Sequence, residues 1–292
     1  MNNRKILYSL SFLLLVSGFQ AHADSSVWTV EKDGNILFIG GTIHLLTTSD
    51  YPLPAAFGKA YAKSGIVVLE TDLQKLQSPE FQATMIHELS YADGRNLQQE
   101  VNENTYRALE QFFTSRGIPM ANIIGFKPGM VSTMITMVEL RRLGLVGIGV
   151  DTYFSTKSID DQKKMGQLET VETQLAFIAN MGAGQADEML IYTLADIERL
   201  PTLMQSLKDA WRQGNMARLR EVGITPFKNE FPVIYQSLLV DRNNAWIPQI
   251  EAMLKTRAVE FVLVGALHLA GDDGLLAQLS TRGYKVQQFQ AD

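Results

Sequence analysis

Short apolar runs near both ends of the chain are separated by a long stretch in which apolar residues recur at helical spacing. Residues 27–30 and 36–39 flank an Asp-Gly pair at 33–34, which is a strong signal for a β-hairpin. Residues 66–69 and 260–265 are unbroken runs rich in β-branched residues, typical of strands buried on both faces. These runs predict a sheet to which both ends of the chain contribute.

The stretch between these strands has mainly helical periodicity. A predicted helix over 55–64, between two of the strands, favours parallel pairing with a right-handed crossover. Residues 79–257 form a predicted helical insertion in which Pro201 breaks the longest helix, and 164–170 favours a short strand. We therefore predict an α/β fold with a central mixed, largely parallel sheet built from both chain ends and a large helical insertion. No low-complexity linker divides residues 24–292, so we expect a single domain.

Two of the predicted strands end in the same local pattern, a glycine followed three positions later by a histidine. The patterns are Gly41 to His44 and Gly265 to His268, each just past an apolar run. Ligands bind at the carboxyl ends of strands in open α/β sheets, so we expect both imidazoles at one rim. Neutral imidazole is a common metal ligand, although a lone histidine at a strand end is more often a capping or core residue. His87 lies in a predicted helix without a partner motif, and we interpret it as structural.

Glu70 directly follows the buried strand 66–69, where an unpaired carboxylate is costly to bury. We expect this strand to lie next to the one that leads to His44. The rim would then bring His44, Glu70 and His268 together as ligands of a divalent metal. A metal held in this way can polarise a carbonyl group and lower the pKa of a bound water to about 7.

Two residues near these ligands are candidates for supporting roles. Asp72 is two residues past Glu70 in extended chain, so it could be a further ligand, an acceptor for a ligand, or a plain helix cap. Thr42 lies beside His44 and could orient the imidazole through a hydrogen bond.

The middle of the chain supplies the candidate catalytic residues Glu169, Arg242 and Asn243. Glu169 is the candidate general base, and a charged residue that merely begins a helix is an equal alternative. Arg242 could clamp a carboxylate or an oxyanion, with Asn243 positioning it. A plain salt bridge to surrounding acids would explain Arg242 equally well.

The composition narrows the class of protein. The chain has no cysteine, so thiolates are excluded as ligands or nucleophiles and only nitrogen and oxygen donors remain. Its hydrophobic content of 46% is enough for a core without disulfides. The formal net charge of −5 argues against nucleic acid as a partner, because phosphate binding needs a basic footprint.

Residues 1–23 have the pattern of a cleavable signal peptide. Arg4 and Lys5 precede the apolar stretch 6–19, and Ala21-His22-Ala23 is a small-residue cleavage pattern. The apolar stretch is too short to span a bilayer comfortably, and no second long apolar run follows. We therefore expect cleavage after Ala23, a periplasmic or secreted location, and no membrane span in the mature protein.

In these motifs the chain resembles the TraB/GumN family, whose animal members include the Tiki proteins. The matching segments run from about residue 28 to 289 and comprise 41–45, 69–73, 149–151, 167–170, 242–243 with Trp246, 264–271, 274–276 and 283–284. No single Gly-x-x-His pattern is specific, but the ordered set is. The resemblance therefore covers essentially all of the predicted mature chain.

The resemblance implies a fold similar to the erythromycin-esterase/ChaN-like group, with a central sheet surrounded by helices. The Tiki branch is described as metal-dependent proteases, which implies His44, Glu70 and His268 as ligands of Mn or Co. Zn would also suit these donors. We therefore expect an exported metal-dependent hydrolase, peptidase-like, acting on a peptide or small-molecule substrate.

Two other functions are compatible with the same residues. One is metal-independent ester hydrolysis with a histidine as general base. The other is a non-enzymatic envelope protein that binds haem or a peptide. Tyr51, Tyr61 and the methionine-rich helix predicted over 128–143 could contribute to such a binding site.

Overall fold

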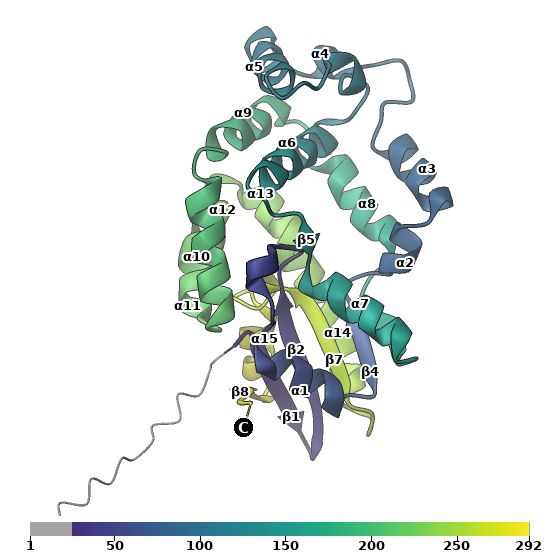
Figure 1. Ribbon diagram of the computed structural model, residues 1–292, viewed down its shortest axis with the longest axis vertical. Helices are drawn as coiled ribbons and strands as arrows, with labels where there is room; N and C mark the ends of the chain where they lie inside the picture. The colour runs from purple at the N-terminus through teal and green to yellow at the C-terminus, as the bar shows by residue number, and fades with distance from the viewer. Residues whose placement is uncertain (1–24, 292) are drawn as a thin grey trace, which may run out of the picture.

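The computed structural model describes residues 25–291, in which a mixed sheet carries helices on both faces (Figure 1). The predicted signal peptide, residues 1–23, lies outside the described residues. The strand order in the sheet is β6-β4-β7-β2-β1-β8. The strands are β1 (Val27–Lys32), β2 (Asn35–Thr42), β4 (Ile66–Leu69), β6 (Lys164–Gln167), β7 (Glu260–Gly265) and β8 (Lys285–Gln288). The four strands from β6 to β2 are parallel, and β1 and β8 are antiparallel additions.

The predicted hairpin is confirmed. Lys32 pairs with Asn35, so the connection is the two-residue loop Asp33-Gly34, and both loop residues have positive φ, 52° and 82°. This is the backbone of a turn whose twist matches the flanking strands, and Asp-Gly is a preferred sequence for it. The turn places β2 antiparallel to β1, so that Gly41 lies at the carboxyl end of β2 and His44 follows it.

The sheet differs from the prediction in one respect. The strand before Glu70, β4, does not lie next to β2, because β7 pairs in parallel with both and separates them. β7 contains the apolar run 261–264, and the centre of the sheet buries both faces of this run. The short strand predicted over 164–170 is confirmed as β6, which forms the exposed edge of the sheet, so the insertion contributes one strand.

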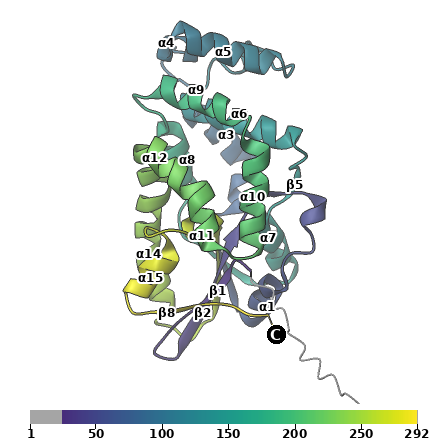
Figure 2. The same cartoon turned by 90° about the vertical axis from the view of Figure 1, so that its left-hand side faces the viewer.

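Helices cover the two faces of the sheet and create a separate core on each (Figures 1 and 2). On one face lie α1 (Ala55–Lys63) and α7 (Val150–Asp160), whose Phe57 and Phe154 pack with Phe38 and Phe261. On the other face lie α14 (Arg242–Met253) and α15 (Leu275–Thr281). There Trp246 packs with residues of β1, β2 and β7 that alternate along these strands with residues of the first core. Side chains point to opposite faces at successive strand positions, so each buried strand feeds both cores.

The remaining helices form a lobe beyond the carboxyl ends of the parallel strands (Figure 1). They are α2 (Leu73–Leu76), α3 (Pro79–Glu88), α4 (Leu97–Glu100), α5 (Glu103–Thr114), α6 (Pro128–Arg142), α8 (Val171–Asn180), α9 (Ala186–Asp196), α10 (Leu200–Arg212), α11 (Met216–Leu219), α12 (Thr225–Glu230) and α13 (Pro232–Tyr235). The lobe has its own core, centred on Phe113, Ile135 and Leu190. Ser78 caps α3 as its sequence predicts, with Pro79 in the first turn. Among the described helices, none has the length and apolar content needed to cross a membrane.

Glu139 of α6 is fully buried and binds two arginines, so it is expected to stabilise this lobe. Burial raises the pKa of Glu139, but hydrogen bonds from Arg142, at 2.7 Å, and from Arg116 outweigh it and lower the pKa below 4.5. Glu139→Gln should lower the free energy of unfolding by about 1.5–3 kcal/mol, since hydrogen bonds between charged groups are lost. We expect the lower part of this range because 61% of the Arg142 side chain is exposed and solvent screens the pair.

Urea unfolding of the wild type and of Glu139→Gln at several pH values checks this prediction. A carboxyl group whose pKa is lowered by folding stabilises the protein above its unfolded value and loses that effect as the pH falls. The difference between the two proteins should therefore be full near neutral pH and shrink below about pH 4.5. Glu103→Gln is the matched control, because Glu103 pairs with Arg107 on an exposed helix surface. Equal losses for both variants would contradict the prediction.

Candidate functional site

The two Gly-x-x-His segments lie side by side, because β2 and β7 are parallel neighbours with Gly41 opposite Val264. Beyond the strands, His44 and His268 line one cavity of about 510 Å³, together with Glu70 from the end of β4. His268 forms part of the floor and is 5% exposed, whereas the side chain of His44 is 64% exposed at the mouth. The structure thus brings the three predicted ligand residues to one rim.

Arg242 is the centre of the hydrogen-bond network beneath this cavity. Its Nη2 donates to Glu70 Oε2 at 2.5 Å and to Glu169 Oε1 at 2.7 Å, and its Nε donates to Glu169 Oε2 at 3.1 Å. Its Nη1 donates to His268 Nε2 at 3.1 Å and to the Leu238 carbonyl at 3.3 Å. All five guanidinium N–H groups are therefore engaged by the protein. Arg242 contributes a positive charge to the site, and donation to a substrate would require breaking one of these bonds.

The local structure explains how Arg242 reaches this position. It is the first residue of α14, directly after the π-helical segment Gln236–Asp241. Such segments offset the following helix and are frequent at functional sites. Leu238 and Leu239 of this segment also line the cavity.

Asn243 holds His268 in one orientation. Its Nδ2 donates to the carbonyls of His268 and Asp273 at 3.2 and 2.9 Å, which leaves Oδ1 to accept from His268 Nδ1 at 2.7 Å. The proton of the neutral imidazole therefore lies on Nδ1, and Nε2 accepts from Arg242. Burial, with the nearby charge of Arg242, lowers the pKa of His268 to about 3 despite the carboxylate of Glu70. His268 is a neutral hydrogen-bond acceptor at physiological pH.

Glu70 is a fixed carboxylate in this network. Its Oε1 accepts a hydrogen bond of 2.6 Å from the backbone N–H of Gly265, where a Cβ would come within 3.3 Å of that oxygen. Burial would raise the pKa of Glu70, but His268 and Arg242 outweigh this effect and lower it to about 2. Glu70 is therefore ionised throughout the physiological range.

Asp151 is a member of the site that the sequence analysis did not identify as functional. Its Oδ2 lies 2.8 Å from His44 Nδ1, and its carboxylate raises the pKa of His44 to about 9. Close to Asp151 in the chain, Gly147–Ile148 is a short strand, β5, paired with β3 (Leu45–Leu46). One feature of the sequence could have identified Asp151: it ends the Gly-Val-Asp segment 149–151, which is among the segments that resemble the family.

Gly149 allows the close approach that joins these two segments. A Cβ at this position would lie 2.3 Å from the carbonyl oxygen of His44. The following residue, Val150, donates from its backbone N–H to the carbonyl of Ile43 at 3.1 Å. The loop that carries His44 and the start of α7 are thereby held together, and Asp151 is placed against the imidazole.

Asp72 and Glu169 make structural contacts instead of the functional ones considered for them, and Thr42 does not orient His44. Asp72 caps α2 by accepting from the backbone N–H groups of Gln74 and Lys75, both at 3.0 Å, so it is a helix cap. Thr42 Oγ1 makes no hydrogen bond with His44 and is buried without a partner. Glu169 accepts from Trp246 Nε1 at 3.1 Å as well as from Arg242, and it does not line the cavity.

His87 has the structural setting predicted for it. It is exposed on α3, and its Nδ1 lies 3.3 Å from Glu88 Oε1. The two tyrosines considered for haem binding form hydrogen bonds with the residues that flank α7. Tyr51 donates to the Ile148 carbonyl at 3.0 Å and Tyr61 donates to Asp161 Oδ2 at 2.6 Å.

The donor chemistry suits a divalent metal, but the arrangement does not. Glu70 Oε2 and His268 Nε2 both face the guanidinium of Arg242, so a cation already stands between the two donors. Within residues 25–291, no group of three or more His, Cys, Asp or Glu side chains is arranged to hold a metal ion. A metal shared by both residues would require Arg242 to move away.

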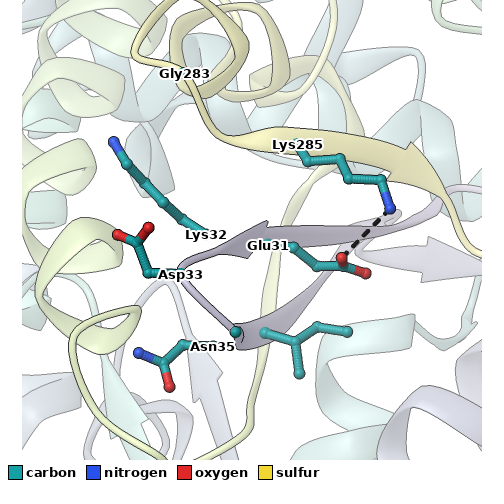
Figure 3. Close-up of a pocket in the computed structure, with 8 residues that line it drawn as sticks. Glu31, Lys32, Asp33, Asn35, Gly283 and Lys285 are labelled. Carbon is teal, nitrogen blue, oxygen red and sulfur yellow. Dashed lines mark hydrogen bonds and ion pairs between the residues drawn. The ribbon is translucent and has the colours of Figure 1, made fainter.

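A further hollow lies at the opposite end of the sheet, around the β1–β2 turn (Figure 3). Lys285 and Glu31 form an ion pair of 3.4 Å there, and Lys32, Asp33 and Asn35 are the other polar side chains of its lining. It contains no histidine and no buried carboxylate. The combination of perturbed titratable groups and a concave surface occurs at the carboxyl ends of the strands, which is where we place the candidate site.

The fold and the set of residues at its rim define a particular class of protein. The model of the TraB/PrgY/gumN family matches residues 26–288, so the chain belongs to this family. The resemblance seen in the sequence is thereby confirmed over nearly the whole chain. No curated protein and no solved structure gives a significant match.

Proposed function

We propose that the protein is a hydrolase that cleaves an ester or peptide bond at the rim formed by β2 and β7. The observation that carries this proposal is the pairing of His44 with Asp151 at the mouth of a cavity beside the unpartnered hydroxyl of Thr42. An imidazole whose Nδ1–H is held by a carboxylate presents Nε2 as a base in its neutral form, and the pKa of about 9 means that this form is reached as the pH rises towards 9. A buried hydroxyl without a partner can donate to charge that develops on a substrate oxygen.

In the proposed reaction, His44 Nε2 accepts a proton from a water molecule as the water oxygen bonds to the carbonyl carbon. The carbonyl electron pair moves onto oxygen, and the Thr42 hydroxyl donates a hydrogen bond to that oxyanion. The pair then returns, the bond to the leaving oxygen or nitrogen breaks, and His44 delivers its proton to the leaving group. Asp151 holds the imidazole in one tautomer and stabilises its protonated form. Arg242 keeps Glu70 and His268 fixed beneath the reacting atoms.

A metal-dependent form of the same hydrolase is our second proposal. One guanidinium faces the two buried carboxylates of Glu70 and Glu169, so these three groups keep a net negative charge, which favours a bound cation. His44, Glu70 and His268 would hold Mn, Co or Zn only after Arg242 had moved away from the two donors. We also propose, from the pattern in residues 1–23, that the protein is exported to the periplasm or secreted.

Hydrolysis of a panel of esters and fluorogenic peptides by the purified protein, before and after exhaustive chelation, tests these proposals. We expect turnover that survives chelation, because the residues at the rim provide a base and an oxyanion donor without a metal. Loss of turnover on chelation, restored by Mn²⁺ or Co²⁺, would favour the metal-dependent form. Absence of turnover with every substrate, together with an absorption band on haem titration, would favour the binding protein instead.

A further inference from the structure

Two cavities at the rim, here called compartments, share the lining residues Thr42, His44 and Glu70. The first, here called the apolar compartment, is the cavity of about 510 Å³ described above, which extends between α6, α10 and the segments before α14. The second, here called the polar compartment, has a volume of about 320 Å³ and extends towards α2, α7 and α8. A bond placed at His44 would therefore have one substrate group in each compartment.

The apolar compartment is lined almost entirely by aliphatic and aromatic side chains beyond its junction with the site. They include Met137, Leu140, Met204, Leu207 and Phe227. Met137 and Met204 are half-buried and do not belong to the hydrophobic cores described above. Flexible methionine side chains adapt to apolar ligands of variable shape. This compartment fits an extended apolar group and gives it no hydrogen-bond partner.

The polar compartment contains buried polar atoms that have no partner within the described part of the chain. They are Thr42 Oγ1, Thr71 Oγ1 and Asp151 Oδ1, and both threonines are only 3% exposed. Gln77 and Gln174 add amide groups to a lining that also contains leucines. Leaving a buried polar atom unpaired is unfavourable, so these three atoms mark positions where a ligand group would bind.

The charge of this compartment limits the chemistry of that ligand group. Glu70 and Asp151 contribute carboxylates, and among the described residues of this lining only His44 can carry a positive charge, which it does below a pH of about 9. An anionic head group would be repelled by the carboxylates, whereas hydroxyl or amine groups could donate to Asp151 Oδ1, and hydroxyl groups could also accept from the two threonines.

We infer that the substrate is amphipathic, with an extended apolar acyl chain in the apolar compartment and a leaving group that carries hydroxyl or amine donors in the polar compartment. This inference rests on the proposed hydrolase function and names the substrate class for that site. The acyl carbonyl lies at the junction, beside His44 and Thr42.

Two matched substrate series test the inference. The first compares glycerol monoesters of acetic, butyric, hexanoic and octanoic acid, for which kcat/KM should rise about fourfold per added methylene until the compartment is full. The second compares monooctanoylglycerol with ethyl octanoate, which lacks the free hydroxyls, and the glycerol ester should be preferred about tenfold. A flat chain-length profile, or no preference for the glycerol ester, would overturn the inference.

Two substitutions address the compartments one at a time. Met137→Trp should fill part of the apolar compartment and lower the ratio of octanoyl to acetyl turnover at least about tenfold, whereas Met165→Trp on the edge strand, outside both compartments, should leave that ratio unchanged. Thr71→Val removes one hydroxyl from the polar compartment and should reduce the preference for the glycerol ester over the ethyl ester. Equal effects of Met137→Trp and Met165→Trp would contradict the assignment of the apolar compartment.

A binding measurement separates failure of the inference from failure of the proposed function. Calorimetric titration of the His44→Ala variant with monooctanoylglycerol and with monoacetylglycerol does not depend on turnover. Selective binding of the octanoyl ester without hydrolysis by the wild type would overturn the hydrolase and support the two compartments. Hydrolysis of short esters with no selective binding of the octanoyl ester would support the hydrolase and overturn the compartments.

Discussion

Replacing Arg242 with alanine is expected to lower the free energy of unfolding by about 3–5 kcal/mol, because it leaves buried carboxylates without their cation. The side chains of Arg242, Glu70 and Glu169 are 7%, 11% and 7% exposed, so water cannot replace the lost hydrogen bonds. Glu70 also loses the charge that helps to lower its pKa to about 2. Chemical unfolding monitored by circular dichroism at neutral pH measures this difference.

The control for this prediction is Arg220→Ala. Arg220 also binds a carboxylate through two nitrogens, with 3.0 and 2.8 Å contacts to Asp272, but the two side chains are 51% and 76% exposed. An exposed ion pair of this kind contributes about 0–1 kcal/mol. Similar losses for Arg220→Ala and Arg242→Ala would mean that the buried network does not stabilise the rim.

A partial rescue would show that the loss arises from the unpaired charge. Adding Glu169→Gln to Arg242→Ala removes one of the two carboxylates that Arg242 binds, so the double variant should be more stable than Arg242→Ala alone. If the two substitutions simply add their losses, the destabilisation of Arg242→Ala must come from lost packing against Trp246 and Phe177 instead.

Replacing His44 with alanine is expected to lower kcat by about 10²–10⁴, the usual contribution of a general base. The folded state should be retained, since 64% of the His44 side chain is exposed. Steady-state kinetics on the substrate that the wild type hydrolyses best, with thermal unfolding beside it, measures both effects. His87→Ala is the matched control, because His87 is an exposed histidine beside a carboxylate on a helix away from the rim.

Two companion variants distinguish the roles around His44. Thr42→Val keeps the shape of the side chain and removes the hydroxyl, and loss of one oxyanion donor should lower kcat by about 10²–10³. Asp151→Asn keeps the hydrogen bond and removes the charge that stabilises the protonated imidazole, so it should also lower kcat. Full activity of His44→Ala would exclude this residue as the base and end the proposal as stated.

The network at the rim shows how stability and function are linked in this fold. Glu70 follows β4, Arg242 begins α14, and His268 follows β7, so one guanidinium ties three elements together. Buried ion pairs of this kind are costly to form and are worth more for position than for stability. We interpret Arg242 as the residue that fixes the floor of the cavity, whereas the exposed His44 is the base of the proposed reaction.

Local patterns in the sequence predicted most of the elements of the fold. The Asp33-Gly34 hairpin and the cap at Ser78 depend on chemistry within a few residues, and both were predicted correctly. The pairing of β4 with β7 rather than with β2 was not predicted. Strand order depends on which apolar faces pack together across the whole chain, and the periodicity of one strand contains no information about its neighbours.

Some residues of the candidate site could likewise be predicted from local patterns, and others could not. The repeated Gly-x-x-His pattern and the carboxylate after a buried strand were sufficient to select His44, Glu70 and His268, because each stands at the end of an apolar run. The role of Asp151 was missed, since it is 107 positions from His44 and is placed by a two-residue strand. Such a short pairing leaves almost no trace in hydrophobic patterning.

The sequence by itself determined the class of fold, the rim at which polar side chains gather, and the family to which the chain belongs. Only the tertiary structure decided what those side chains contact: Arg242 binds Glu70, which lies 172 positions earlier in the chain, and takes the place between two donors that a metal would need. The physical reason is that residue type and local spacing are encoded by neighbouring positions, whereas the partner of a buried charge is chosen by how distant elements pack.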